Sequence, residues 1–155
     1  MSAEAAADAR PKLTDAEMLA RFHGAKRRPP CSDALGLELL AINQEQMTVR
    51  AAFTGSPSWV NPMGALQGGF VTAMLDEVMA VAGIVASNVT ATVPTLELKV
   101  SFLRPCPPGR LEATARVVKW GRQIAFLESE LFDPDGRPVA RATATATIAA
   151  VPKRG

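Results

Sequence analysis

The sequence predicts an α+β fold in which one long central helix is wrapped by an antiparallel sheet of five or six strands. The segment from about Gln67 to Ser87 is apolar on nearly every side, so a helix there must be buried on more than one face. The residues that follow it alternate between apolar and polar with a period of two, which is typical of strands. With 155 residues, 48% hydrophobic and 21% charged, the composition indicates one compact domain.

The N-terminal part predicts a short helix. Thr14 and Glu17 form a capping box, in which each side chain accepts a hydrogen bond from a backbone amide at the helix start. The helix should end near His23, because Pro29 and Pro30 cannot continue it. His23 is the only histidine in the chain, and we expect it at the surface.

We expect three regions along the chain. Residues 1–30 hold a tail and the short helix, residues 31–151 form the domain, and residues 152–155 form a second tail. The first dozen residues lack an apolar signal core, and Cys31 and Cys106 have no partner at metal-ligand spacing. These features predict a cytoplasmic protein without a disulfide framework or a metal site.

Hydropathy patterns place the strands. Two apolar runs between Ala34 and Phe53 flank a polar connection at residues 43–46, which indicates a hairpin. Because the connections between consecutive strands are hairpin-sized, we expect an antiparallel sheet. The turn at Asp133–Gly136 joins the last two of four further strands, which are expected at residues 95–102, 110–119, 123–132 and 138–149.

Two adjacent carboxylates, Asp76 and Glu77, interrupt the apolar helix. Either both lie on one narrow solvent-exposed edge of the helix, or one is solvated and the other is held in a site, because burial of a carboxylate without a partner is costly. The pair also argues against a membrane span, where each charge would cost roughly 2.5–3.5 kcal/mol. Arginine and lysine are dispersed along the chain, so we do not expect nucleic-acid binding.

The helix start, Gln67-Gly68-Gly69, offers amides that lack partners within the helix and can hold a carbonyl oxygen as it gains negative charge. The glycines could equally permit only a tight turn. Gly68 and Asp76 lie roughly 12 Å apart along a helix axis, so one chain cannot bring both to one carbon atom. Two chains with antiparallel helices could, which predicts an obligate dimer with two sites, each built from both chains.

The run Asn61-x-x-Gly64-x-x-Gln67-Gly68-Gly69, with Asp76 seven residues later, resembles the signature of the PaaI-type acyl-CoA thioesterases of the hotdog superfamily. The likeness covers about residues 35–150. It implies the hotdog fold, homodimers that pair into tetramers, and hydrolysis of acyl-CoA thioesters with aryl or medium-chain acyl groups. CoA would enter only as part of the substrate, with no further cofactor.

The resemblance also implies roles for single residues. Asp76 would be the general base or the nucleophile, and Gly68 would supply the oxyanion amide. Asn61 would hold the water or the thioester, and Thr95 would help to position the attacking water. Gln67 stands where the family more commonly has histidine; it can donate a hydrogen bond but cannot titrate.

The substrate contacts are less sharply indicated. Arg104 and the turn at Gly121-Arg122 lie near predicted strand ends, where they could pair with CoA phosphates. Trp59 and Met63 are candidates for the wall of an acyl pocket, whereas Phe70 and Met74 are expected in the core.

Two other functions stay open. One is a catalytically silent acyl-CoA-binding module, which Gln67 favours. The other is a hotdog dehydratase or hydratase, which the lack of a histidine near the motif disfavours.

Overall fold

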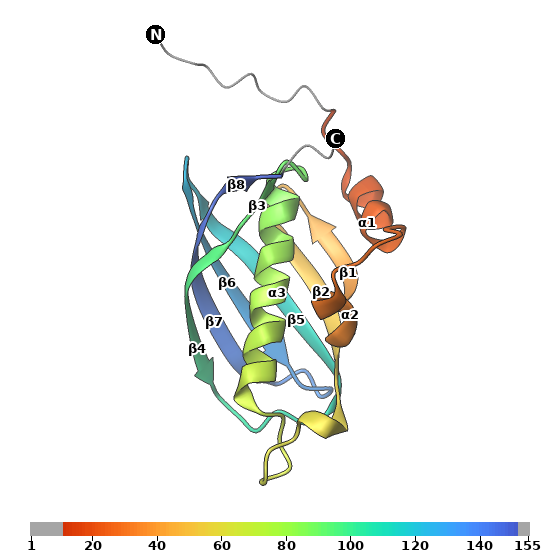
Figure 1. The fold of residues 1–155 in the computed structure, drawn as a ribbon, viewed down its shortest axis with the longest axis vertical. Coiled ribbons are helices and arrows are strands. Elements are labelled where there is room, and N and C mark those ends of the chain that lie inside the picture. Colours follow the sequence, from red (N-terminus) through yellow and green to blue (C-terminus); the bar gives the residue numbers. More distant parts are fainter. Residues whose placement is uncertain (1–10, 152–155) are drawn as a thin grey trace.

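The computed structural model describes residues 11–151 and contains the predicted long helix wrapped by a sheet (Figure 1). The predicted central helix is confirmed and is capped by Gln67 and Ser87. The helical segments are α1 (Asp15–His23), α2 (Pro30–Ala34), the 3-10 turn η1 (Pro57–Trp59) and α3 (Gly68–Ala86).

The sheet is six-stranded and antiparallel, with the strand order β1-β2-β5-β6-β7-β4, which confirms the predicted fold class. β4 pairs with β7, so the connection after β4 crosses the sheet and is not the hairpin that we expected. β3 and β8 form a separate two-stranded sheet. The strands are β1 (Glu38–Asn43), β2 (Thr48–Gly55), β3 (Ala91–Thr92), β4 (Thr95–Phe102), β5 (Gly109–Trp120), β6 (Ile124–Phe132), β7 (Pro138–Thr147) and β8 (Ala149–Ala150).

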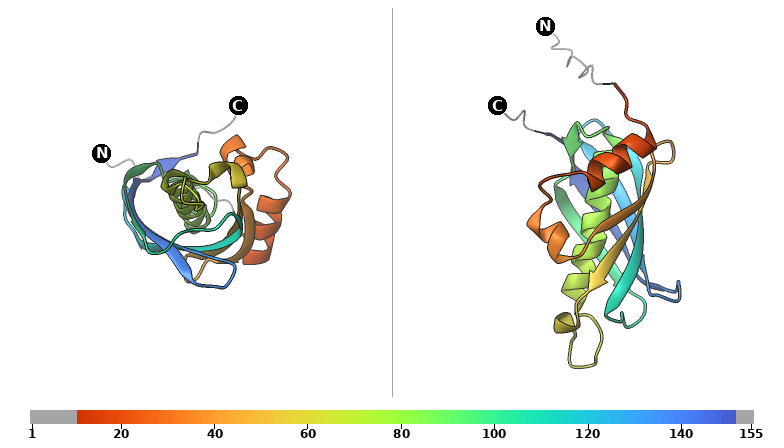
Figure 2. Two further views of the ribbon diagram at one scale, coloured as in Figure 1. Left: turned by 90° about the horizontal axis from the view of Figure 1, so that it is seen from below. Right: turned by 90° about the vertical axis from the view of Figure 1, so that its right-hand side faces the viewer.

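The sheet curves around α3, as the view along the helix in Figure 2 shows. By length and composition α3 could cross a membrane, but here it is the central helix of the fold. Ser129 on β6 donates a hydrogen bond to the carbonyl oxygen of Leu75, 3.3 Å away, and ties the helix to the sheet. Near the other end of α3, a Cβ at Gly83 would come within 2.4 Å of Val93, so only glycine permits this approach. The buried side chains of α3 include Val71, Met74, Leu75, Val78, Met79, Val81 and Val85.

The N-terminal helix packs against β1 (Figure 2). Both hydrogen bonds of the predicted capping box between Thr14 and Glu17 are present. Met18 is fully buried against the core. His23 is exposed, as predicted, and its Nε2 lies 2.7 Å from the carbonyl oxygen of Leu39. Residues 1–10 and the predicted tail at 152–155 lie outside the described residues.

The predicted end of the first helix at His23 is confirmed. The helix α2 was not predicted; Pro30 takes its first position, where the missing N–H is not needed. Two strand predictions are wrong. The first strand begins at Glu38 and not near Ala34, since the chain leaves α2 through Gly36, which has φ +63°. The last predicted strand is divided between β7 and β8.

Candidate active site

The loop before α3 is organised by Asn61. Its side-chain Oδ1 accepts hydrogen bonds from the amides of Met63 at 2.9 Å and Ala65 at 3.3 Å. The turn also needs Gly64, whose φ is +81°. The carbonyl half of the Asn61 amide is therefore committed to the loop, and its NH₂ group is the half left to meet a substrate.

Gln67 caps α3. Its Oε1 accepts a hydrogen bond from the amide of Gly69 at 2.6 Å. The amide of Gly68, by contrast, donates to no acceptor within residues 11–151. An unpaired amide at the positive end of a 19-residue helix is suited to hold a carbonyl oxygen that is gaining charge.

Asp76 and Thr95, to which the family resemblance gave roles around the attacking water, meet beside α3. The hydroxyl of Thr95 donates a hydrogen bond to Oδ1 of Asp76, 2.8 Å away. A bulge in β4 between Thr95 and Glu97 shifts the register, and Thr95 pairs with the inward-facing Ala146. This bond orients a half-buried carboxylate and leaves its second oxygen available.

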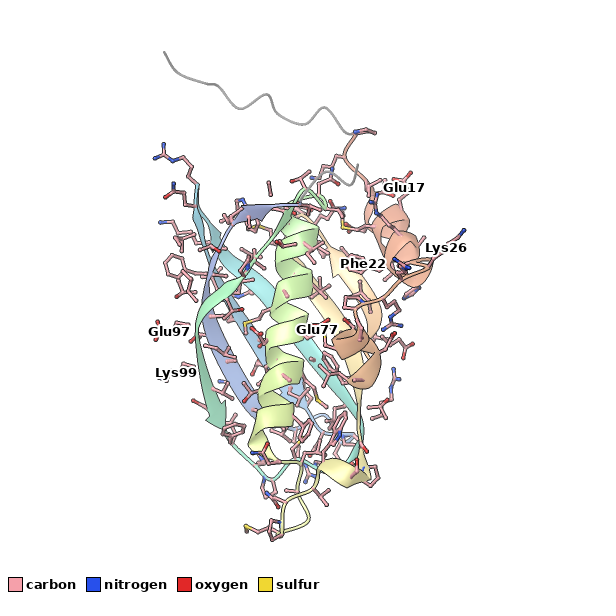
Figure 3. All side chains as sticks on the ribbon, viewed as in Figure 1. Glu17, Phe22, Lys26, Glu77, Glu97 and Lys99 are labelled. Atoms are coloured by element: carbon pink, nitrogen blue, oxygen red, sulfur yellow. The ribbon has the colours of Figure 1, made fainter. Side chains whose placement is uncertain are left out.

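The neighbouring acid, Glu77, points to the opposite flank of α3, toward α2 (Figure 3). Its Oε1 accepts a hydrogen bond from the hydroxyl of Ser32, which is only 2% exposed. The expectation that one of the two carboxylates would be solvated is wrong, because both are half-buried and each accepts a hydrogen bond from a hydroxyl. Ser32 was missed because it lies 45 positions away from Glu77 in the sequence.

A cavity of about 480 Å³ lies beside the start of α3. Its volume is in the range of small-molecule sites, roughly 300–1,000 Å³. Three of the predicted site residues line it, namely Asn61, Gly68 and Arg104. The guanidinium of Arg104 donates to the carbonyl oxygen of Pro138 at 2.7 Å. Most of the remaining wall is apolar and includes Met63, Val71, Phe102, Leu103, Cys106 and Val139.

Cys106 belongs to the cavity wall but is not suited to attack a substrate. Burial, with a smaller contribution from Asp133, raises the pKa of its thiol to about 11. Since the thiolate is the nucleophilic form, Cys106 is a neutral wall residue near pH 7. Phe102 is the other important wall residue that we did not single out, although the alternation in β4 already placed it with the apolar set.

Other predicted residues lie elsewhere. The Gly121-Arg122 turn lies at the end of the molecule where α3 finishes, next to residues 147–148, so it is far from Gly68 of the same chain. Met74 is fully buried, as predicted. The prediction for Phe70 is wrong, because its ring is 37% exposed and stacks on Trp59 with centroids 4.6 Å apart.

A larger hollow of about 730 Å³ lies on the outer face of the sheet. None of the predicted site residues lines it. Two of its arginines are paired with acids across the strands, Arg116 with Glu128 and Arg141 with Glu130, each at 2.5 Å. Charges that already satisfy one another offer little to a ligand, so we place the site at α3.

The fold and the site define a class of protein. A helix inside a curved antiparallel sheet, with an unpaired amide at its start and a hydroxyl-held acid on its flank, is the arrangement of a hotdog-fold thioester hydrolase. The family model of the thioesterase superfamily matches residues 63–140, and the chain belongs to this family.

Individual relatives agree with this assignment. The chain is 31% identical over 134 residues to a medium/long-chain acyl-CoA thioesterase, YigI, of Salmonella typhimurium, covering 75% of this chain and 83% of the relative. A phenylacetic acid degradation-related protein from Ralstonia eutropha JMP134 has a similar crystal structure, with 34% identity, a TM-score of 0.77, and coverage of 83% and 98% of the two chains. The PaaI protein of Escherichia coli shares the fold, with 22% identity, a TM-score of 0.68, and coverage of 76% and 86%.

Proposed function

We propose that this protein hydrolyses acyl-CoA thioesters to a free acid and CoA, with aryl or medium-chain acyl groups as the candidate substrates. The observation that carries the proposal is that the same helix presents two groups, the Gly68 amide without a hydrogen-bond acceptor and an Asp76 carboxylate that Thr95 holds in place. The named activity of the Salmonella relative, a medium/long-chain acyl-CoA thioesterase, supports acyl-CoA thioesters with medium-chain acyl groups as substrates.

The mechanism assigns each group one task. Asp76 takes a proton from water as the water oxygen adds to the thioester carbonyl carbon, or its carboxylate attacks that carbon directly. The Gly68 amide stabilises the resulting oxyanion. The carbon–sulfur bond then breaks and CoA leaves as a thiolate, which needs no protein acid because a thiolate is a stable leaving group. After direct attack this step leaves a mixed anhydride on Asp76, which water then hydrolyses to the free acid and the Asp76 carboxylate. The mechanism therefore requires no titration of Gln67, whose side-chain oxygen caps the helix.

We infer that two copies build each site. Gly68 and Asp76 lie eight positions apart on the single helix α3, roughly 12 Å along its axis, so the amide of one chain must serve the acid of the other. Among the described residues β4 has a neighbouring strand on one side only, and Leu96 on this edge strand is 61% exposed. The residues of α3 that this chain does not bury include Gly69, Ala73 and Ala80, and their small size permits a second helix to approach closely.

This homodimer also gives Arg122 a role, although it lies far from the cavity of its own chain. In an antiparallel pair, the Gly121-Arg122 turn of one chain approaches the cavity of its partner, where it and Arg104 can bind the phosphates of CoA. Pairing of two dimers into a tetramer and a cytoplasmic location stay predictions, as does the absence of any cofactor besides the CoA of the substrate.

A catalytically silent acyl-CoA-binding module is the second candidate function, and the lack of a titratable side chain at Gln67 favours it. Release of free thiol from a panel of linear and aryl acyl-CoA thioesters separates the two. We expect hydrolysis of at least one substrate class. Binding of acyl-CoA without thiol release from any member of the panel would refute the proposed hydrolysis.

Gly68→Pro tests the oxyanion amide. Proline is tolerated at the first position of a helix, and the preceding residue, Gln67, already has extended geometry, so the change removes the N–H with little effect on the backbone. We expect a loss of about 10²–10³-fold in kcat. Gly68→Ala is the matched control, because it keeps the amide while adding a Cβ that would meet the movable ring of Phe102 at 3.0 Å.

Subunit exchange tests the shared site. Asp76→Ala and Gly68→Pro chains are each expected to be inactive, but their heterodimer contains one site with both groups intact. A random mixture should therefore recover up to about a quarter of the wild-type rate. No recovery after confirmed exchange would place both groups of a site within one chain.

A further inference from the structure

Phe102 has an unusual position at the end of the edge strand β4. Its side chain is 56% exposed, although the alternation along β4 places it on the same face as the half-buried Leu98 and Val100. A single exposed aromatic residue needs no explanation by itself. Phe102, however, also lines the cavity at the start of α3, and it does so beside the amide that we assign to the oxyanion.

The ring of Phe102 points its tip at Gly68. A Cβ built on Gly68 would lie 3.0 Å from Cζ and 3.3 Å from Cε1 of the ring. The tip of the ring therefore fills the space beside the first helical residue, and a group as large as a methyl enters there only if the ring shifts.

This closeness matters for the substrate. A carbonyl oxygen held by the Gly68 amide would lie about 2.9 Å from the nitrogen, which brings the carbonyl carbon to about 4 Å from it. Because Gly68 and Phe102 line the same cavity, an acyl chain that enters it from this carbonyl passes the Phe102 ring. A methylene chain can pass the ring edge, whereas a ring or a branch at the same place would collide with it.

The rest of the wall fits an unbranched chain. Val71, Leu103, Cys106 and Val139 offer apolar surface, and the buried thiol of Cys106 carries no charge near pH 7. The polar groups of the cavity are partly committed, since the Asn61 carbonyl oxygen accepts within its own loop and Arg104 donates to Pro138. Their remaining N–H groups are the donors assigned above to the thioester and the CoA phosphates. Burial of methylene groups against such a wall is favourable by roughly 0.8 kcal/mol each.

We propose that Phe102 determines the acyl selectivity of this site: it admits acyl groups that are unbranched next to the carbonyl and excludes those that are aromatic or branched there. This inference rests on the proposed thioester hydrolysis and narrows its substrate class from aryl or medium-chain acyl groups to linear ones. Phe102 acts by occupying space and takes no part in the chemical step.

The test compares octanoyl-CoA, benzoyl-CoA and 2-methyloctanoyl-CoA as substrates of the wild-type protein, Phe102→Ala and Phe102→Leu. We expect the wild type to favour octanoyl-CoA in kcat/KM by about 10-fold or more, the range in which an apolar pocket discriminates. Phe102→Ala should reduce this ratio by about 10-fold, mainly by a higher rate with the two bulky substrates, and Phe102→Leu should lie between. Phe126→Ala is the matched control, because Phe126 is a strand phenylalanine that is 45% exposed and does not line the cavity.

The outcomes separate the two levels of the proposal. Hydrolysis with the same substrate ratio in Phe102→Ala and wild type, or a wild-type preference for benzoyl-CoA, overturns the role of Phe102 and leaves the proposed hydrolysis intact. If no thioester is hydrolysed, the selectivity is still measured by calorimetric binding of the non-hydrolysable thioethers S-octyl-CoA and S-benzyl-CoA. Selectivity that depends on Phe102 in binding, without turnover of any thioester, overturns the hydrolysis and supports the selectivity.

Discussion

The two flanks of α3 carry the same chemical pair in two different settings. On each flank a half-buried carboxylate accepts a hydrogen bond from a hydroxyl, but Glu77 is held by the buried Ser32 of α2, whereas Asp76 is held by the exposed Thr95 of an edge strand. Figure 3 shows Glu77 turned toward α2, within the chain. This difference agrees with the proposed function, in which the carboxylate with the buried partner serves stability and the carboxylate with the exposed partner stays open to a substrate or a second chain.

The comparison predicts its largest effect for the two acids themselves. Asp76→Asn should lower kcat by about 10²–10⁴-fold, the usual contribution of a general base, with little change in thermal stability. Glu77→Gln should retain most of the rate and lose about 1 kcal/mol of stability, because the neutral amide is a weaker acceptor for Ser32. Free-thiol release and thermal unfolding of both variants measure the two effects. A larger loss of rate in Glu77→Gln than in Asp76→Asn would reverse the assignment of the flanks.

The framework of this comparison could be predicted from the sequence. The long helix follows from an apolar segment with no wet face, and the strands follow from alternation with a period of two. The capping box of α1 and a start of α3 near Gln67 were also predicted correctly. These features depend on local sequence, in which each element carries its own signal.

The contacts made on each flank of α3 could not be predicted in the same way. Ser32 and Glu77 are 45 positions apart, and α2, which brings them together, is only a five-residue helix that begins at a proline. The contact of Phe102 with Gly68 likewise depends on where an edge strand ends in space. The placement of Thr95 beside Asp76 was foreseen only through the family resemblance, and the bulge that produces it leaves no clear mark in the alternation.

Removal of the two hydroxyl groups that hold these acids should have smaller effects, on stability for Ser32 and on rate for Thr95. Ser32→Ala should cost about 1–3 kcal/mol, because it leaves the Glu77 carboxylate half-buried without its partner, and should lower Tm by several degrees with the rate unchanged. Thr95→Val should instead lower kcat by about 10-fold at nearly constant KM and Tm, since the exposed Thr95 orients Asp76 and buries little surface.

Thr95→Ser is the matched control for this pair, because it restores the hydroxyl and should restore most of the rate. Steady-state kinetics and thermal unfolding of the three variants provide the measurements. If Thr95→Val lowers Tm as much as Ser32→Ala does, then the two flanks do not differ in the way that we infer.

A third carboxylate, Asp133, lies in the turn between β6 and β7 and provides a structural reference outside the two flanks of α3. Its Oδ1 accepts hydrogen bonds from the amides of Arg137 at 2.9 Å and Asp135 at 3.0 Å, and its Oδ2 accepts one from the guanidinium of Arg137 at 2.9 Å. The backbone amide of Arg137 is the main cause that holds the pKa of Asp133 below its ordinary value. Every partner lies within one turn between β6 and β7, so we expect no effect of this acid on catalysis.

The lowered pKa of Asp133 determines how its contribution to stability changes with pH, which is the smallest effect that we predict. Because the folded state binds the proton of Asp133 more weakly than the unfolded state, this carboxylate stabilises the fold above about pH 4, its unfolded pKa, and the contribution is lost as the pH falls through the folded value. Asp133→Asn should therefore unfold at a lower urea concentration than the wild type at pH 7, and the difference should shrink by pH 3. Thiol release at pH 7 should be unchanged. A difference in urea midpoint that stays constant between pH 7 and pH 3 would show that the charge of Asp133 does not stabilise the turn.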